Sequence, residues 1–249
     1  MPEIAIHIEN LSYRYQGQLT NTLSDINLKI EAGSTIGLFG PNGAGKTTLM
    51  HLMTGILKNT NGTISLFNSK VGAKHKETNN LFGFVPQDFS FYQELSPTEN
   101  LQFFGAFYGL SKPMITQRTD ELLEVFGLTE VRKKPVAKFS GGMKRKVNLA
   151  IGIIHQPKII FLDEPTVGVD VQSRCAIMDY IKKLNEEGAT LVYTSHQLNE
   201  AEEICEKIAL INEGKIIAFE NISTLLAKHQ ENNLENLFLN LSKNPISHV

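Results

Sequence analysis

Residues 40–47 read Gly-Pro-Asn-Gly-Ala-Gly-Lys-Thr, an order of glycines, lysine and hydroxyl side chain that suits the binding of phosphate. The segment follows a strand-like stretch at 35–39 and precedes helical spacing at 46–57, which is the context that a phosphate-binding loop requires. Glycines let backbone N–H groups turn inward around phosphate oxygens, and the positive end of the helix dipole adds to the attraction. A glycine-rich turn that matches by chance is the alternative, and the strand–loop–helix order disfavours it.

Two side chains of this loop carry chemistry of their own. Lys46 would reach the β- and γ-phosphates of a nucleotide, and the Thr47 hydroxyl would bind Mg²⁺. The loop therefore predicts a nucleoside triphosphate with Mg²⁺ as its ligands. The candidate nucleotide-binding residues of the segment are Gly40, Pro41, Asn42, Gly43, Ala44, Gly45, Lys46, Thr47 and Thr48.

Two acidic residues follow a short apolar run at 159–162. A buried strand whose end brings a carboxylate beside a phosphate loop is a common way to hold the second side of Mg²⁺, and we expect Asp163 to do so. Glu164 would point elsewhere, where it could polarise a water for attack on the γ-phosphate. The alternative is a strand followed by solvated acids at a turn made by Pro165, and the phosphate loop upstream disfavours it.

Residues Ser140, Gly141 and Gly142 stand at the start of a predicted helix. Ser140 is a favourable N-cap, and the two glycines leave backbone N–H groups open to an anion. A capped surface helix is an equally good explanation on physical grounds alone. The basic run at 144–146 is typical of a solvated helix face.

Taken in order, the phosphate loop, the Ser-Gly-Gly helix start and the Asp-Glu strand about 20 residues later resemble the ATP-binding cassette ATPases, the motor domains of ABC transporters. The resemblance spans residues 3–220. It implies an α/β fold of the P-loop NTPase type, with a RecA-like core and a mostly parallel sheet, an N-terminal antiparallel β subdomain and an inserted helical subdomain. It also implies ATP and Mg²⁺ as cofactors.

The resemblance assigns roles to further residues. Tyr15 looks like the aromatic residue that stacks on adenine, with Tyr13 a weaker candidate. Gln87 looks like the glutamine that touches Mg²⁺ or the attacking water, and His196 like the switch histidine that contacts the γ-phosphate. Asp170 resembles the loop that communicates across the dimer. Each has a plain alternative when taken alone, as a strand aromatic, a loop residue or a helix cap.

The chain departs from the family signature Leu-Ser-Gly-Gly-Gln at both ends, where it has Phe139 and Met143. Met143 has no amide side chain, which leaves the role of that position at the nucleotide open. The form Ser-Gly-Gly-Met before basic residues, the segment 165–170 and a short helix at 234–239 resemble the branch that serves ABC-2-type exporters.

Hydrophobic periodicity places the remaining elements. We expect a β-rich stretch at 3–38 and a C-terminal hairpin at 207–219 that turns at 212–214. The cassette domain would span 1–220 with a helical subdomain inserted at about 89–157, and a tail at 221–249 would hold one short helix. The expected helices are 46–57, 97–108, 114–126, 142–154, 171–187 and 198–207, and the expected strands include 63–67, 159–162 and 190–194.

Composition narrows the setting of the protein. The chain has 249 residues and a formal net charge of −2, so nucleic acid is a poor candidate partner. Cys175 and Cys205 show no metal-ligand spacing and are expected to be free thiols. The N-terminus lacks the pattern of a secretory signal, and no apolar run approaches the ~18 residues of a membrane span. We therefore expect a cytoplasmic protein, and the resemblance implies that it works at the inner face of the cell membrane.

The resemblance also implies partners. One chain holds both a phosphate loop and a Ser-Gly-Gly turn, but roughly 95 residues and a helical subdomain separate them. We expect two copies, or this chain and a paralogous cassette subunit, to bind two ATP molecules head-to-tail and to drive an integral-membrane permease. The aromatic segment at 88–100 would either contact a permease helix or pack within the helical subdomain.

Two other functions remain as alternatives. A cassette ATPase without a transport role, such as one that assists iron–sulfur cluster assembly, would have similar length and the same motifs. A kinase-like enzyme acting on a small molecule would share the phosphate loop, but the sequence offers no acceptor site and leaves the Ser-Gly-Gly turn unexplained.

Overall fold

Two β-sheets form the framework of the computed structural model, which describes residues 2–58, 61–72, 78–195 and 197–243. The smaller sheet has the strand order β2–β1–β4–β5 and is antiparallel. The larger sheet has the order β10–β9–β3–β8–β7–β6, and its strands are parallel except for the terminal hairpin β9–β10. The strands are β1 (Ile4–Tyr13), β2 (Leu23–Glu31), β3 (Thr35–Phe39), β4 (Asn61–Leu66), β5 (Ser69–Lys70), β6 (Phe82–Val85), β7 (Ile159–Asp163), β8 (Thr190–Thr194), β9 (Lys207–Asn212) and β10 (Lys215–Asn221).

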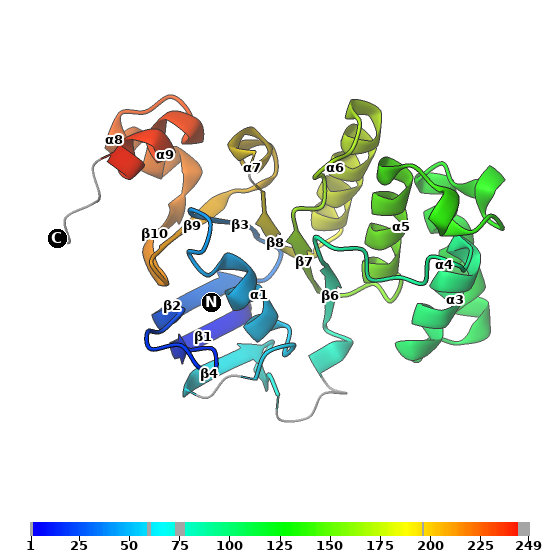
Figure 1. Ribbon diagram of the computed structural model, residues 1–249, viewed down its shortest axis with the longest axis horizontal. Coiled ribbons are helices and arrows are strands. Elements are labelled where there is room, and N and C mark those ends of the chain that lie inside the picture. Colours follow the sequence, from blue (N-terminus) through cyan, green and yellow to red (C-terminus); the bar gives the residue numbers. More distant parts are fainter. Residues whose placement is uncertain (1, 59–60, 73–77, 196, 244–249) are drawn as a thin grey trace.

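Helices cover the parallel sheet on both faces. Figure 1 shows α1 and the antiparallel sheet on one side of the parallel sheet, with α5, α6 and α7 on the other. The helices α3 and α4 lie at the far end of the molecule from α8 and α9. The helices are α1 (Lys46–Met53), α3 (Pro97–Phe107), α4 (Lys112–Val125), α5 (Gly141–Ile153), α6 (Val171–Glu186), α7 (Leu198–Ile204), α8 (Ile222–His229) and α9 (Leu234–Lys243), with 3₁₀ turns at Thr129–Val131 and Val136–Lys138.

The strand β7 shows why the sheet needs cover on both faces. Ile159 and Phe161 belong to the core shared with α1 and the antiparallel sheet, whereas Ile160 and Leu162 belong to the core shared with α5 and α6. All four side chains are fully buried. Because alternate residues of a strand point to opposite faces, a continuous apolar run is the signature of a strand buried on both sides. The predicted α/β fold with a mostly parallel sheet is confirmed.

Most predicted elements differ from the observed ones by one or more residues at an end, and three show the larger differences. The first helix ends at Met53 rather than 57, because Gly55 adopts a left-handed conformation with φ +72° and stops it. The helix predicted to reach 207 ends at Ile204, because Cys205 is extended and β9 begins two residues later. The expected strand at 63–67 begins earlier, at Asn61, and ends at Leu66.

Several elements were not predicted, among them β6 and α8. The strand β6 is only 4 residues long and contains Gly83, so it gives no period-2 signal, yet it pairs with β7 along its full length. The tail holds two helices rather than the one expected, because α8 precedes α9. Gln230, the residue that follows α8, is left-handed with φ 56° and ends that helix.

The tail packs onto α7. Leu234 and Leu237 of α9 are buried in the core that includes α7, and the Leu234 N–H donates to the carboxylate of Glu202. Both cysteines are free thiols, as expected, with Cys175 exposed and Cys205 buried. Burial raises the pKa of the Cys205 thiol. Over the described ranges, no helix is both long enough and apolar enough to cross a bilayer.

The approach of α5 to β6 depends on the absence of side chains. A Cβ added at Gly83 would stand 2.0 Å from the carbonyl oxygen of Gly152 in α5. This backbone-to-backbone contact sets the position of β6 and therefore of the loop that follows it, which includes Gln87.

We expect Gly83→Ala to lower the free energy of unfolding by about 1–3 kcal/mol, because overpacking against backbone cannot be relieved by a side-chain rotation. Gly105→Ala in α3 is the matched control, since its added methyl would meet a side-chain atom, Ile115 Cγ1 at 2.9 Å, rather than backbone. Alanine also favours a helix over glycine by up to ~1 kcal/mol. Urea unfolding followed by circular dichroism measures both, and equal stabilities of the two variants would contradict the expectation.

Candidate active site

The phosphate loop joins the carboxyl end of β3 to the start of α1, as the sequence predicted. A Cβ at Gly40 would stand 2.0 Å from the carbonyl oxygen of Ile211, so only glycine allows the loop to pass β9 so closely. Gly45 is left-handed, with φ +108°, and forms the N-cap of α1. The first turn of α1 carries no acidic side chain, which leaves its N–H groups and dipole available to an anion.

Lys46 folds back over the loop. Its Nζ donates hydrogen bonds to the carbonyl oxygens of Gly40 at 2.7 Å and Pro41 at 3.1 Å. Burial lowers the pKa of the Lys46 ammonium, while the negative charges of Glu164 and Asp163 oppose that shift. A cation held by neutral carbonyls beside two carboxylates can exchange these contacts for phosphate oxygens at little cost.

A cavity of about 450 Å³ opens over the loop. It is lined by residues of four segments: the loop between β1 and β2, the phosphate loop with the start of α1, the segment after β6 and the end of β7. Tyr15 is one of the residues that line it, and its hydroxyl lies 3.1 Å from Thr48 Oγ1 while its ring meets Tyr13 edge-on. The lining residues are Tyr15, Gln18, Thr22, Asn42, Gly43, Gly45, Lys46, Thr47, Thr48, Gln87 and Glu164.

The two carboxylates at the end of β7 are held differently. Asp163 is 5% exposed, and its Oδ1 accepts a hydrogen bond of 2.6 Å from the hydroxyl of Thr194, its neighbour on β8. Glu164 has φ 50°, a left-handed conformation that is uncommon for a residue with a side chain. This backbone turn separates the two carboxylates and brings Glu164 alone into the lining of the cavity. Strain of this kind collects at functional sites.

Gln87 meets Glu164 across the cavity, where its Nε2 donates to Glu164 Oε2 at 2.9 Å. Two side chains of α5 hold the backbone on which Gln87 lies. Asn148 Nδ2 donates to the carbonyl oxygen of Pro86 at 3.0 Å. The guanidinium of Arg145 donates to the carbonyl oxygen of Gln87. The backbone of Pro86 and Gln87 is therefore held by α5, while the side chain of Gln87 binds the candidate base Glu164.

Arg145 corrects one interpretation. The basic run at 144–146 was expected to be solvated, but Arg145 is 6% exposed and stacks over the ring of Phe89 at 4.7 Å. Burial lowers the pKa of its guanidinium, and the charges of Glu164 and Asp88 oppose that shift. An arginine that binds backbone carbonyls has no sequence signature, because its partners are not side chains.

The Ser-Gly-Gly turn begins α5, and Ser140 caps it by accepting a hydrogen bond from the Met143 N–H at 3.3 Å. Ser140 and Gly141 are exposed, whereas a Cβ at Gly142 would stand 2.3 Å from Ser173 Oγ and 2.7 Å from Asp170 Oδ2. Among the described residues that line the cavity, none belongs to this turn. One chain therefore does not bring its own turn to its own phosphate loop.

Asp170 is exposed and forms the N-cap of α6, where its carboxylate accepts from the Ser173 N–H at 2.8 Å. This contact is the main cause that lowers the pKa of Asp170. His196 lies outside the described residues. Met143, which departs from the family signature, packs its half-buried side chain against the core.

The donor set suits a magnesium ion. Mg²⁺ keeps several waters and takes only one or two protein carboxylates beside substrate phosphates. Asp163 would supply the carboxylate, Thr47 a hydroxyl and Gln87 an amide oxygen. Over the described part of the chain there is no cluster of three histidine, cysteine or acidic side chains that would instead point to a dedicated metal cage.

A phosphate loop between a parallel strand and a helix, with a strand-end acidic pair beside it, defines a P-loop nucleotide-hydrolysing domain. The family model described as "ABC transporter" matches residues 23–167, more than half of the chain. The chain therefore belongs to the ABC transporter family.

Several relatives agree with this assignment. The linearmycin resistance ATP-binding protein LnrL of Bacillus subtilis (strain 168) is 39% identical over 213 residues, which cover 86% of this chain and 68% of that protein. The daunorubicin resistance ATP-binding protein DrrA3 of Streptomyces coeruleorubidus is 33% identical over 218 residues, which cover 88% of this chain and 68% of that protein.

Solved structures give the same result. The ATP-binding subunit of an ABC transporter superposes with a TM-score of 0.87 at 26% identity, covering 96% of this chain and 99% of that one. A dimeric ATP-binding cassette in a post-hydrolysis state, bound to ADP and Pi, superposes with a TM-score of 0.79 at 27% identity, covering 87% and 98%. The predicted family and fold are confirmed.

The activity follows from the family. The chain is an ATP-binding subunit of a transporter, and it binds and hydrolyses ATP. The alternative of a cassette ATPase without a transport role finds no support among the relatives described above, whose names assign them to resistance.

We expect Lys46→Ala to weaken ATP binding at least about tenfold, because charge-assisted hydrogen bonds contribute roughly 1.5–3 kcal/mol and ~1.4 kcal/mol corresponds to a factor of ten. Titration with a fluorescent ATP analogue measures the change. Lys29→Ala, which removes an exposed lysine from β2, is the control and should bind as the parent does. Unchanged affinity of the Lys46 variant would contradict the proposed role.

Proposed function

We propose that this chain is the motor subunit of an ABC-2-type exporter and works at the cytoplasmic face of a membrane as a dimer closed around two ATP molecules. The observation that carries the proposal is the separation of two half-sites in one chain. The cavity over the phosphate loop is lined without Ser140, Gly141 or Gly142, while Ser140 and Gly141 are exposed. The resistance functions in the names of the relatives support export.

A second cassette, turned head-to-tail, would supply the missing half. Its Ser140 turn would cap the γ-phosphate held by Lys46 of the first chain, and the helix dipole of its α5 would favour that charge. Asp170 lies beside the turn, and Asp170 and the exposed Val167 would belong to the same interface. The second cassette is another copy of this chain or a paralogous subunit.

In the proposed reaction, Glu164 accepts a proton from the attacking water. The water oxygen bonds to the γ-phosphorus, and the bond from that phosphorus to the bridging oxygen breaks, which yields ADP and phosphate. Gln87 orients Glu164 through the hydrogen bond that joins them. Lys46 and the N–H groups of the loop stabilise charge on the phosphates.

Three more assignments complete the proposed site. Thr47, Gln87 and Asp163 would hold Mg²⁺, which neutralises charge on the β- and γ-phosphates. Tyr15 would stack on adenine, and His196 would contact the γ-phosphate. We further propose that residues 1–220 form the cassette domain, with the helical subdomain inserted at about 89–157, and that 221–249 form the tail.

We expect Glu164→Gln to keep ATP binding but to lower the hydrolysis rate at least about 100-fold, because the amide cannot accept the proton. The variant should accumulate as an ATP-bound dimer, which light scattering after size-exclusion chromatography measures. Glu186→Gln, on the exposed end of α6, is the control and should hydrolyse ATP at the parent rate. A Glu164→Gln variant that stays monomeric in the presence of ATP would contradict the proposed dimer around two ATP molecules.

Aromatic side chains after Gln87 form the proposed surface for the membrane partner. Tyr92 and Phe103 are each 47% exposed and contact each other edge-on at 5.0 Å, and Phe107 is 68% exposed. The Tyr92 backbone is fixed to α3 by reciprocal hydrogen bonds of 2.9 Å with the amide of Asn100. An exposed aromatic surface on a rigid support suits an amphipathic helix from the cytoplasmic side of a permease.

This surface is joined to the cavity. The Ser90 N–H donates to Asn148, whose amide also binds the backbone of Pro86, and Gln87 follows with its contact to Glu164. A change at the γ-phosphate would thus reach the aromatic surface through a short run of backbone held by α5.

We expect Tyr92→Ala combined with Phe103→Ala to weaken co-purification with the permease at least about tenfold, since buried aromatic anchors dominate interface energy. ATP hydrolysis by the purified subunit should be unchanged. Leu19→Ala, at a side chain 95% exposed elsewhere, is the control. Phe91 is less suitable because it packs against the core. Retention of the permease by the double variant would contradict this surface.

A further inference from the structure

Glu200, near the start of α7, is a fully buried carboxylate with no assigned role. It is 0% exposed and accepts hydrogen bonds from four side chains. Its Oε2 accepts from Tyr193 Oη at 2.6 Å, from Thr166 Oγ1 at 2.8 Å and from Ser195 Oγ at 3.0 Å. Its Oε1 accepts from Arg174 Nε at 2.7 Å.

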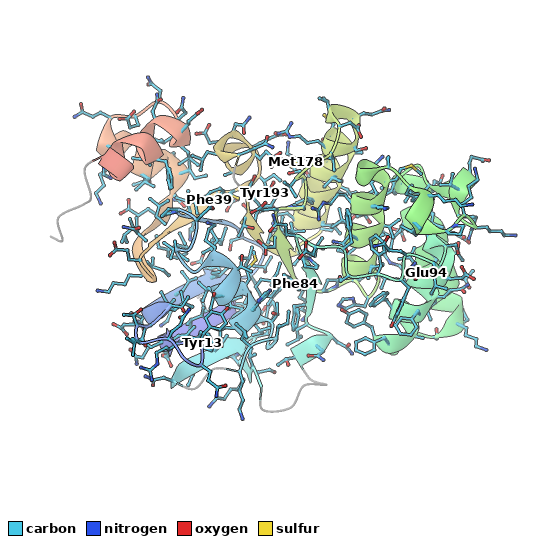
Figure 2. The ribbon with its side chains drawn as sticks, viewed as in Figure 1. Tyr13, Phe39, Phe84, Glu94, Met178 and Tyr193 are labelled. Carbon is cyan, nitrogen blue, oxygen red and sulfur yellow. The ribbon has the colours of Figure 1, made fainter. Side chains whose placement is uncertain are left out.

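These donors keep the carboxylate charged. Burial by itself would raise the pKa of Glu200, but the hydrogen bonds from Tyr193, Arg174, Thr166 and Ser195 outweigh it and lower the pKa below its usual value. A buried anion is tolerated only when its oxygens are fully hydrogen-bonded, so the surrounding segments are held to one geometry. The hydroxyl oxygen of Tyr193, a residue labelled in Figure 2, also lies 4.0 Å from the sulfur of Met178 in α6.

The donors lie on segments that carry the proposed chemistry. Thr166 is in the loop after β7, between Glu164 and Asp170. Ser195 directly follows Thr194, whose hydroxyl holds Asp163. The carboxylate oxygen that accepts from both hydroxyls therefore joins the loop after β7 to the loop after β8.

The fourth donor extends the connection to the start of α6. Arg174 lies in the first turn of α6. The backbone N–H of Arg174 donates to the carbonyl oxygen of the N-cap residue Asp170 at 2.9 Å. Asp170 and Ser173 in turn leave no room for a side chain at Gly142. In addition, Arg145 Nε donates to the carbonyl oxygen of Val167 at 3.4 Å. The Ser-Gly-Gly turn therefore packs against the segments that Glu200 holds.

We propose that Glu200 is a positioning residue of the ATPase, which holds Thr166 and Ser195 on one oxygen so that the loops after β7 and β8 move as a unit. Through this contact the position of the cavity carboxylates is tied to the surface that carries Asp170 and Gly142. The proposal rests on the roles proposed above for Glu164 and the dimer surface. Glu200 itself does not line the cavity within the described structure and acts through its neighbours.

Glu200→Gln tests the role of the negative charge on Glu200. The glutamine side chain has nearly the same shape, but its amide N–H group faces side chains that are themselves hydrogen-bond donors. We expect kcat for ATP hydrolysis to fall at least about tenfold, because small displacements of reacting groups are costly. KM for ATP should change by less than about twofold, because the phosphate loop is untouched. Glu203→Gln is the matched control: it removes an exposed carboxylate of α7 that pairs with Arg174 and Lys182, and kcat should be retained.

A double-mutant cycle separates positioning from simple stabilisation. Thr166→Val and Ser195→Ala each remove one hydroxyl, and we expect each to lower kcat by about tenfold, with the double variant lower by much less than the product. Tyr193→Phe removes a donor that lies within the sheet, so it should lower Tm while kcat stays within about twofold.

Independent, multiplicative effects of Thr166→Val and Ser195→Ala would overturn the proposal, as would a kcat loss in Tyr193→Phe equal to theirs. A parent-like kcat in folded Glu200→Gln would do the same. If Glu200→Gln fails to fold, the cycle still decides. A failure of the general-base role proposed for Glu164 would give a different result. Glu164→Gln would then continue to hydrolyse ATP, while the variants of Glu200, Thr166 and Ser195 would still show the expected losses of kcat.

Discussion

The parallel pairing of β3, β8 and β7 is the constraint on which the site depends. Neighbouring parallel strands end at the same edge of a sheet, so the loops that leave them must converge. The register pairs Asp163 directly with Thr194, and β3 lies on the other side of β8 with the phosphate loop at its end. The loops need no extended structure of their own to bring the catalytic groups together, because the sheet places the strand ends from which these loops start.

Most of the cavity could be predicted because its chemistry is written in short, contiguous segments at strand ends. The phosphate loop needs glycines in one order, and the acidic pair needs an apolar run before it. Both conditions are local, and in the structure Lys46, Gln87 and Glu164 do line one cavity. The assignment of Tyr15 to adenine came from resemblance, and its place in the lining of that cavity is compatible with the assignment.

What escaped prediction depends on partners distant in sequence. The strand β6 exists because β7 offers it an edge and because Gly83 allows α5 to approach. Arg145 has the composition of a surface residue, but it is buried against backbone carbonyls more than 50 positions away. Glu200 looks like one acid among several in α7, and only the convergence of hydroxyls from two loops distinguishes it. In each case the partner is a backbone group or a residue elsewhere in the chain, which a local pattern does not register.

The contrast between the two thiols gives the molecule a natural handle for spectroscopy. Cys175 is exposed on α6, five residues after Asp170, whereas the Cys205 thiol is buried and its pKa is raised, which makes it a poor nucleophile. A maleimide dye or spin label added to the unaltered chain would therefore attach at one place, near the surface proposed to meet the second cassette. Opening and closing of the pair could then be followed by energy transfer or dipolar spectroscopy without introducing or removing any cysteine.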